Sequence, residues 1–297
     1  MKPGCPGVGL ALSGHPSHVE LLRPLAELVD FLEVCPEQLW NSQTELSSRV
    51  ELYEQLKDET GKPFVAHGLG LSLGTPLSTP EEVSRTERWL SQIARLHERL
   101  ELEWYTDHLG SSHTAGGLVT GLHLPLPHTD EAVQAVKERL ERLRRIVPLV
   151  GFENTVFYFT LEDPMQEASF YNRLCRETGA RLLLDLHNVY AHCRNFGLDP
   201  LAFVGKIDLA NVLELHLSGG SESDPSWLDG PVLRLDSHDG PVPEPVWELL
   251  DEVLPRCPAV RGVTLERIEG TIEPQDVPLL RQELERIRLA VAQKALP

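Results

Sequence analysis

The stretch RLLLDLHN, from Arg181 to Asn188, decides how the rest of the chain is interpreted. Its three consecutive leucines form an apolar run that is too short for a helix and is typical of a strand buried on both faces. Asp185, His187 and Asn188 follow where this run stops. In a barrel of parallel strands, polar residues at the carboxyl end of a strand lie at the mouth, where barrel enzymes keep their chemistry. The stretch therefore predicts a buried barrel strand with ligand-type side chains at its exit.

The same pattern of an apolar segment followed by polar residues recurs along the chain. Eight segments are predicted as strands: Gly7 to Leu12, Asp30 to Pro36, Lys62 to Gly74, Leu102 to His113, Leu149 to Thr155, Arg181 to Asn188, Asn211 to Gly220 and Arg261 to Gly270. Segments with helical periodicity alternate with them, at 16–28, 43–59, 80–100, 130–146, 164–178, 199–206, 245–254 and 274–293. His123 to Pro127 is predicted as a loop extension. Because no linker interrupts the alternation, we expect one (β/α)8 barrel of the TIM type over residues 1–297.

The composition excludes several classes of partner. With 27 Lys and Arg against 45 Asp and Glu, the formal net charge is −18, which repels nucleic-acid phosphates and anionic membranes. The most basic run, at 137–146, interleaves acids and bases at helical spacing, as on a solvated helix face. We therefore expect no nucleic-acid partner. No run of about 18 apolar residues predicts a membrane span either.

The cysteines indicate a reducing environment. Cys5, Cys35, Cys175, Cys193 and Cys257 are widely spaced, odd in number and form no CxxC pair, so they do not suggest a disulfide framework. The amino-terminal residues lack the apolar core of a signal peptide. Both observations favour a cytoplasmic protein. Cys35 and Cys193 lie near strand ends, and we interpret them as small packed thiols.

Side chains of the metal-ligand type gather at the predicted strand exits and in the segment after the seventh strand. They are His67, His108, Glu153, Asp185, Asn188, His216, Asp236, His238 and Glu266. In a barrel, all of them converge at the carboxyl-terminal mouth. One catalytic ion needs only about three protein ligands, so the surplus predicts two or three ions that share bridging carboxylates. Imidazole and carboxylate donors without thiolate suit iron, manganese or zinc.

Each of these histidines, taken singly, is more often a hydrogen-bonded structural residue than a ligand. Asp185 differs, because a carboxylate that follows three leucines is costly to bury unless it is paired or bound to metal. Repetition of the pattern at strand after strand strengthens the metal interpretation. We assign Asp185, His216 and Glu266 to catalysis.

Other polar residues are open to two interpretations. Glu33 and Glu37 fit either a supporting position around the site or plain ion pairs. Asn154 is expected to orient Glu153 or a substrate. The three remaining histidines of the central region are expected on solvated loops, with one of them, His123, able to reach the mouth; they are His113, His123 and His128.

At these residues the sequence resembles the MbnB-like multinuclear non-haem iron oxidases, a family formerly known only as a UPF0276-type domain of unknown function. The similar segments follow the family's order over nearly the whole chain. They are GVGLALSGH at 7–15, DFLEVCPEQLW at 30–40, AHGLGLSLG at 66–74, TDHLG at 106–110, ENT at 153–155, LLLDLHNVY at 182–190, ELHLSGG at 214–220, DSHDGPVPEPVW at 236–247 and TLER at 264–267. Each segment is weakly specific alone, and nine in register are strongly specific.

The resemblance implies a TIM barrel with two or three iron ions that oxidises cysteine residues of a ribosomally made precursor peptide with dioxygen. It also implies a partner protein that grips the leader segment of that peptide. Carried onto this chain, it places the paired irons on His67, His108, Glu153, Asp185, His216 and Glu266. It places a third, more labile ion on Asn188, Asp236 and His238.

Three positions depart from the family pattern. The family commonly has a second histidine four residues after the one that matches His216, and here that position is Gly220. The common asparagine at position 187 is His187, and the usual aspartate after the Glu-Arg pair is Ile268. His187 is expected either to compensate for Gly220 or to cap the site differently.

Two rival functions use the same ligand types. One is a barrel hydrolase or isomerase with two divalent ions, and the other is a metal-binding protein that has lost catalysis. An activity that requires iron and consumes oxygen distinguishes the leading hypothesis from the first rival. Metal retention without oxygen uptake favours the second.

Overall fold

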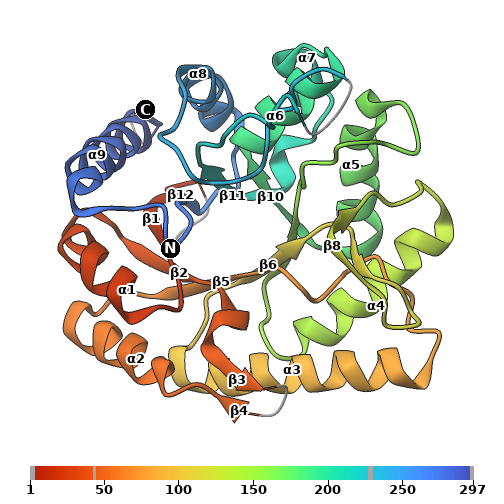
Figure 1. Cartoon of the computed structure of the whole chain (residues 1–297), viewed down its shortest axis with the longest axis horizontal. Coiled ribbons are helices and arrows are strands. Elements are labelled where there is room, and N and C mark those ends of the chain that lie inside the picture. The colour runs from red at the N-terminus through yellow and green to blue at the C-terminus, as the bar shows by residue number, and fades with distance from the viewer. Residues whose placement is uncertain (1–3, 43–44, 227–229, 295–297) are drawn as a thin grey trace.

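Eight parallel strands form a closed barrel in the computed structural model, which describes residues 4–42, 45–226 and 230–294 (Figure 1). The barrel strands are β1 (Gly7–Leu12), β2 (Phe31–Val34), β5 (Phe64–Gly68), β6 (Tyr105–His108), β9 (Val150–Glu153), β10 (Arg181–Asp185), β11 (Val212–Leu217) and β12 (Gly262–Leu265). Each strand pairs with the barrel strand that follows it in the chain, and β12 pairs with β1. The predicted TIM barrel is thereby confirmed.

Helices surround the barrel (Figure 1). The α-helices are α1 (Pro16–Leu22), α2 (Arg49–Thr60), α3 (Pro80–Leu100), α4 (Asp130–Arg144), α5 (Glu167–Thr178), α6 (Leu186–Phe196), α7 (Pro200–Val204), α8 (Glu244–Val253) and α9 (Val277–Lys294). Short 3₁₀ turns supplement them: η1 (Arg23–Leu28), η2 (Pro36–Leu39), η3 (Pro164–Gln166), η4 (Leu209–Asn211), η5 (Leu254–Arg256) and η6 (Pro274–Asp276). The large apolar core lies between this helical ring and the barrel wall. In the described part of the chain, no helix is long and apolar enough to cross a lipid bilayer.

A small aromatic cluster fills the barrel interior below the polar mouth. Phe31 and Trp104 contact each other edge to face, with ring centroids 5.4 Å apart. Glycine is required at position 9, because a Cβ there would lie 2.3 Å from the Phe31 ring. Side chains alternate along a strand, so Glu33 points to the same interior as Phe31, one layer nearer the mouth. The cluster therefore fills the barrel interior one layer below the polar residues of the mouth.

The predicted strand 181–188 is shorter than expected and runs directly into an unpredicted helix. Strand β10 ends at Asp185, and α6 begins at Leu186 without an intervening loop. Asp185 is the N-cap of this helix, and its Oδ1 accepts a hydrogen bond of 2.6 Å from the Asn188 backbone N–H. Such a cap satisfies one of the free N–H groups of the first helical turn. His187 and Asn188 therefore lie in a helical turn rather than on the strand.

The predicted strand 102–113 also divides into two elements. Strand β6 ends at His108, and β7 (Ser111–His113) then pairs in antiparallel fashion with β8 (Val119–Leu124). The predicted loop extension that begins at His123 therefore overlaps β8. This hairpin lies outside the barrel sheet.

The segment before α2 was predicted entirely as helix, and this was wrong at its start. The short strands β3 (Trp40–Ser42) and β4 (Glu45–Leu46) pair there, and the helix begins only at Arg49. Residues 43 and 44 of the predicted helix lie outside the described residues. The predicted strand 62–74 ends early, at Gly68, and irregular backbone follows.

Candidate metal centre

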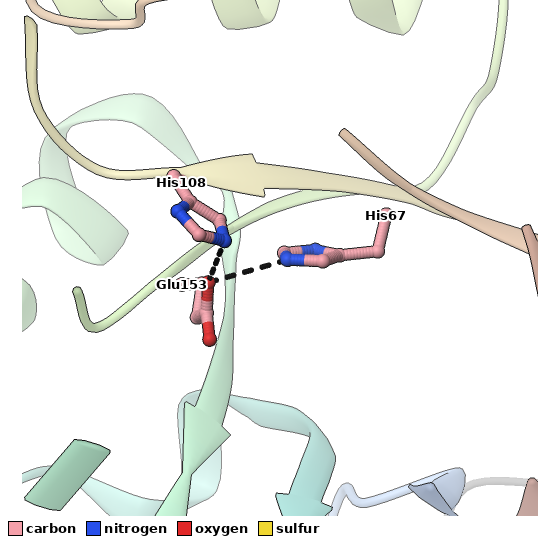
Figure 2. A group of neighbouring side chains, drawn as sticks. All are labelled: His67, His108 and Glu153. Carbon is pink, nitrogen blue, oxygen red and sulfur yellow. Dashed lines mark ion pairs between the residues drawn. The ribbon is translucent and has the colours of Figure 1, made fainter. Parts of the chain in front are cut away.

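The ends of three neighbouring strands bring together the first group of ligand-type side chains. His67 comes from β5, His108 is the last residue of β6, and Glu153 is the last residue of β9. Oε2 of Glu153 lies 2.8 Å from Nε2 of His108 and 3.2 Å from Nε2 of His67. Figure 2 shows both imidazoles pointing at this one carboxylate oxygen.

Buried hydrogen bonds fix the orientation of this group. Nδ1 of His67 lies 2.9 Å from Oγ1 of Thr106, so its Nε2 faces the cavity. The side-chain amide of Asn188 donates to Oε1 of Glu153 at 3.1 Å. Oε2 of Glu153 therefore remains directed at the two histidines. Hydrogen bonds from neighbouring side chains commonly orient metal ligands in this way.

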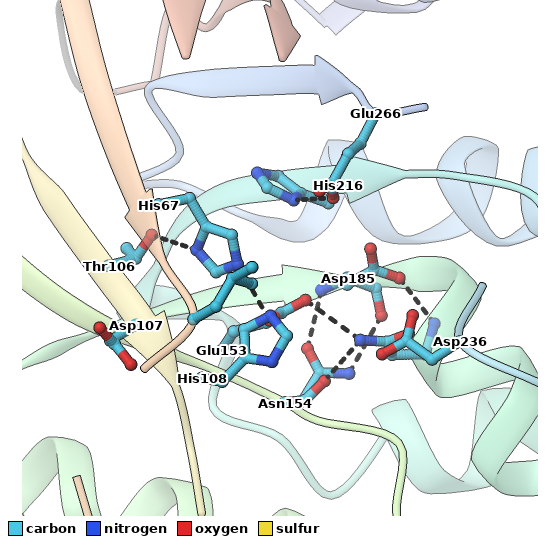
Figure 3. Close-up of polar contacts among 12 residues, drawn as sticks. His67, Thr106, Asp107, His108, Glu153, Asn154, Asp185, His216, Asp236 and Glu266 are labelled. Carbon is cyan, nitrogen blue, oxygen red and sulfur yellow. Dashed lines mark hydrogen bonds and ion pairs between the residues drawn. The ribbon is translucent and has the colours of Figure 1, made fainter. Parts of the chain in front are cut away.

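The second group adds residues from the next strands around the barrel (Figure 3). Asp185 ends β10, and His216 lies on β11 beside it in the strand register. Nδ1 of His216 lies 3.1 Å from Oε2 of Glu266, and its Nε2 lies 3.2 Å from Oε2 of Glu33. His216 is thus held between two carboxylates inside the barrel mouth.

A third group lies in the segment between β11 and α8, which is not part of the barrel wall. Nε2 of His238 lies 2.7 Å from Oδ1 of Asp236, and its Nδ1 lies 3.3 Å from Oε1 of Glu266. The backbone of His238 has a φ of 47°, a left-handed conformation that non-glycine residues seldom adopt. Such strain persists where surrounding contacts hold it in place and is frequent at functional sites.

Buried atoms without hydrogen-bond partners test whether these side chains fit a metal. Among the described residues, six of the nine predicted ligands have a buried atom without a well-aligned hydrogen bond: His67 Nε2, Glu153 Oε2, Asp185 Oδ2, Asn188 Oδ1, Asp236 Oδ1 and His238 Nε2. Four of these atoms meet only as ion pairs, His67 with Glu153 and His238 with Asp236. A buried polar atom without a partner is costly, and a bound cation would satisfy all of them at once. The donor set is nitrogen and oxygen, as iron, manganese and zinc accept. The side chains therefore fit a metal centre.

The electrostatics of the centre are those of closely packed opposite charges. Burial disfavours protonation of His67, but the carboxylate of Glu153 outweighs burial and raises the His67 pKa to about 9. Burial raises the pKa of Asp185 to about 8, with the charge of Glu153 acting in the same direction. Without a cation, protons must therefore balance the carboxylates. A metal ion would replace those protons.

A cavity of about 240 Å³ opens at the mouth above these groups. His67, His108 and Glu266 line it together with Cys35 and, from the third group, His238. The cavity is large enough to admit a substrate side chain of about cysteine size beside an ion. Five of the nine predicted ligands line this cavity, and the other four are buried behind it: Glu153, Asp185, Asn188 and His216.

The structure brings all nine predicted ligands to this one mouth, and their binding of metal stays a prediction. Asn154 differs from expectation, because its side chain bonds to the backbone N–H and C=O of Asp185, at 2.7 and 3.0 Å, and not to Glu153. Glu33, which the sequence left undecided, contacts His216. Asp107 was not singled out; burial raises its pKa to about 7, and it accepts a hydrogen bond from Tyr105.

Of the three histidines expected on solvated loops, His128 lies on a loop but is only partly exposed, and His123 reaches the mouth as the sequence allowed. For His113 the expectation was wrong. His113 is buried and pairs with Glu82, and His128 pairs with Glu167. His123 reaches the mouth, where its Nδ1 lies 3.2 Å from Nδ1 of His108 and its Nε2 lies 2.7 Å from the Leu69 carbonyl oxygen. Burial lowers the pKa of His123 to about 3, so the ring is neutral.

Comparison with known protein sequences gives one family and a set of relatives. A family model described as "RiPP precursor modification enzyme MbnB/TglH/ChrH" matches residues 7–292. A UPF0276 protein of Pseudomonas aeruginosa is 34% identical over 254 residues, covering 83% of this chain and 82% of its own. A UPF0276 protein of Caulobacter vibrioides is 29% identical over 291 residues, covering 97% of this chain and 95% of its own.

Comparison with solved structures supports the fold. A xylose isomerase domain protein from Planctomyces limnophilus superposes with a TM-score of 0.61 at 16% identity, covering 99% of this chain and all of its own. At this level of identity, the similarity is one of fold alone.

Proposed function

Because the chain belongs to the MbnB/TglH/ChrH family of enzymes that modify precursors of ribosomally made peptides, we propose that it is a multinuclear non-haem iron oxidase. Its substrate is a cysteine residue of such a precursor peptide, and dioxygen is the oxidant. A partner protein that binds the leader segment presents the peptide.

One observation carries the proposal: the possible metal positions are linked through shared carboxylates. Three groups of side chains with ligand atoms within 4.8 Å of one another form a chain: His67, His108 and Glu153; Glu153, Asp185 and His216; Asp185, His238 and Glu266. Glu153 belongs to the first two groups and Asp185 to the last two. Shared carboxylates of this kind are what hold two or more ions at short separation.

The side chains have separate tasks in the proposed reaction. Bound iron would supply the redox chemistry and lower the pKa of a substrate thiol. Two ions would be held by His67, His108, Glu153, Asp185, His216 and Glu266, and a third by Asn188, Asp236 and His238. We assign Asp185, His216 and Glu266 to catalysis. Asn188 and Asn154 position Glu153 and Asp185, respectively. Manganese or zinc would fit the same donors but would not supply the iron chemistry.

The test is modification of a cysteine-containing precursor peptide encoded beside the gene, with its leader-binding partner present. We expect a mass change in the peptide that requires both ferrous iron and dioxygen. Asp185→Ala and His216→Ala should abolish it, whereas Asp58→Ala, which removes an exposed carboxylate on α2, should not. Turnover like that of the wild type in both site variants would refute the assignments.

The same experiment separates the two rivals. Activity that continues without oxygen, with manganese or zinc in place of iron, would favour a two-ion hydrolase or isomerase. Iron retained without oxygen uptake, in the presence of peptide and partner, would favour a protein that has lost catalysis.

A further inference from the structure

His187 and Arg234 form an unusual pair beside Asp236 and His238 of the metal centre. His187 is fully buried in the first turn of α6, and its ligand atom lies within 4.8 Å of those of Asp236 and His238. Nδ1 of His187 is buried without a hydrogen-bond partner, whereas Nε2 of His238 and Oδ1 of Asp236 lie 2.7 Å apart as an ion pair. On the other side, Nε of Arg234 donates to Nε2 of His187 at 3.1 Å.

We propose that His187, Asp236 and His238 form a third cation position, and that Arg234 competes with the cation for the His187 ring. The proposal rests on the proposed metal centre and adds two residues of this chain to it. Two imidazoles and a carboxylate are a sufficient protein ligand set for a divalent ion that keeps open positions.

The glycine at position 220 is what makes room for this imidazole. A Cβ at Gly220 would lie 2.8 Å from Cε1 and 3.1 Å from Nε2 of His187, and 2.4 Å from the Leu235 carbonyl oxygen. A side chain at position 220 would therefore meet both the His187 ring and the Leu235 backbone. The two departures from the family pattern are neighbours in space, and the ring from α6 lies against position 220.

Arg234 opposes a cation whichever nitrogen of His187 binds it. An ion on Nε2 would have to displace the guanidinium. An ion on Nδ1 would leave the ring proton on Nε2, where it would face the N–H of Arg234, because a neutral imidazole carries one proton. The positive charge of Arg234 also repels a nearby cation.

Contacts around Arg234 hold it in this position. Its backbone bonds to the side chain of Asn195 through both N–H and C=O, at 2.7 and 3.0 Å. Its guanidinium lies over the ring of Tyr190, 5.7 Å from the centroid. A cation must therefore either displace this held side chain or bind beside its positive charge, which makes the third position the weakest of the centre.

Anaerobic ferrous-iron titration of the purified protein, at one pH, tests the proposal with three variants. His187→Phe keeps a ring but removes both nitrogens, and it should weaken the last-bound ion at least about tenfold, as loss of even an outer partner of a ligand does. Arg234→Met keeps the stem but removes the charge, and it should tighten that ion by about threefold to tenfold. Arg194→Met is the control, because Arg194 also stands beside Tyr190 but pairs with Glu222.

A second measurement keeps the test valid if His187→Phe does not fold. Iron anomalous scattering from crystals of the wild-type protein should place an ion within about 2.2 Å of a His187 nitrogen. An ion held by Asp236 and His238 without His187, or unchanged binding in both His187→Phe and Arg234→Met, would overturn the inference and leave the proposed function standing. Failure of the wild type to bind any iron would overturn the proposed function itself.

Discussion

Replacement of Glu82 by glutamine should destabilise the protein although the residue is remote from the barrel axis. Glu82 lies on α3 and its side chain is only 2% exposed. It pairs with Arg139 of α4, which is fully buried, and with Arg85 at 3.2 Å. Its Oε2 also lies 2.9 Å from Nε2 of His113 on β7. One carboxylate thus joins two helices to the hairpin that carries His123 to the mouth.

The size of the loss follows from these contacts. Burial alone would raise the pKa of Glu82, but His113, Arg85 and Arg139 outweigh it and lower the pKa from 4.5 to about 2. That shift corresponds to roughly 3 kcal/mol of stabilisation of the folded state by the charged carboxylate, and solvent screening reduces this contribution to about 2 kcal/mol. Removing one partner of a buried ion pair costs about 3–5 kcal/mol, because the other charge is left uncompensated. We therefore expect Glu82→Gln to lower the free energy of unfolding by about 2–3 kcal/mol at pH 7.

The pH dependence has a definite sign. Because the pKa of Glu82 is lower in the folded state, its contribution is fully present above about pH 4.5 and disappears as the pH falls towards 2. The difference between Glu82→Gln and the wild type should therefore shrink across that window in urea unfolding followed by circular dichroism. Glu81→Gln is the control, because Glu81 is the exposed neighbour on the same helical turn.

A double variant tests the physical reason for this loss. Glu82→Met with Arg139→Met removes both charges, so it should be more stable than Glu82→Gln, which leaves Arg139 buried without its counter-charge. The reasoning is refuted if Glu82→Gln behaves like Glu81→Gln, or if the double variant is the least stable of the set.

Three further changes test other parts of the structure. Glu153→Gln should lower the iron content by at least one ion per chain without unfolding the protein, because an amide cannot bridge two cations; unchanged iron in elemental analysis would contradict this. Glu101→Gly should stabilise the chain by about 0.5 kcal/mol in urea unfolding, because Glu101 ends α3 with a left-handed φ of 55° that glycine adopts freely; a loss of stability would contradict it. Trp104→Phe should lower the free energy of unfolding by about 2 kcal/mol, since it removes the N–H that donates to buried Glu214 at 2.6 Å. A urea unfolding midpoint like that of the wild type would contradict this and would show that Glu214 finds another donor.

The barrel and the gathering of the six predicted ligands that lie at strand ends could be predicted from sequence because both depend on one repeated local pattern. The leucine run before Asp185 and the short apolar run before Glu153 each indicate a buried strand. Once the strands are parallel, their carboxyl ends meet at one mouth whatever lies between them. His67 and His216 reach that mouth for the same reason.

What the sequence could not predict depends on contacts between distant segments. His113 meets Glu82, 31 residues away, and is buried on β7. His128 meets Glu167, 39 residues away, so it is only partly exposed although it lies on a loop. The start of α6 was missed because its N-cap, Asp185, also ends a strand, and strand exits usually lead into a loop. Nothing in the local pattern indicates that one residue serves both elements.

The two carboxylate oxygens of Asp185 serve different parts of the molecule. Oδ1 caps the first turn of helix α6, and Oδ2 is buried without a hydrogen-bond partner. Replacement of Asp185 by alanine would therefore remove a helix cap, at a cost of about 1 kcal/mol of stability, together with a predicted metal ligand. Asparagine at the same position keeps a capping oxygen and removes the charge, so it separates the two roles.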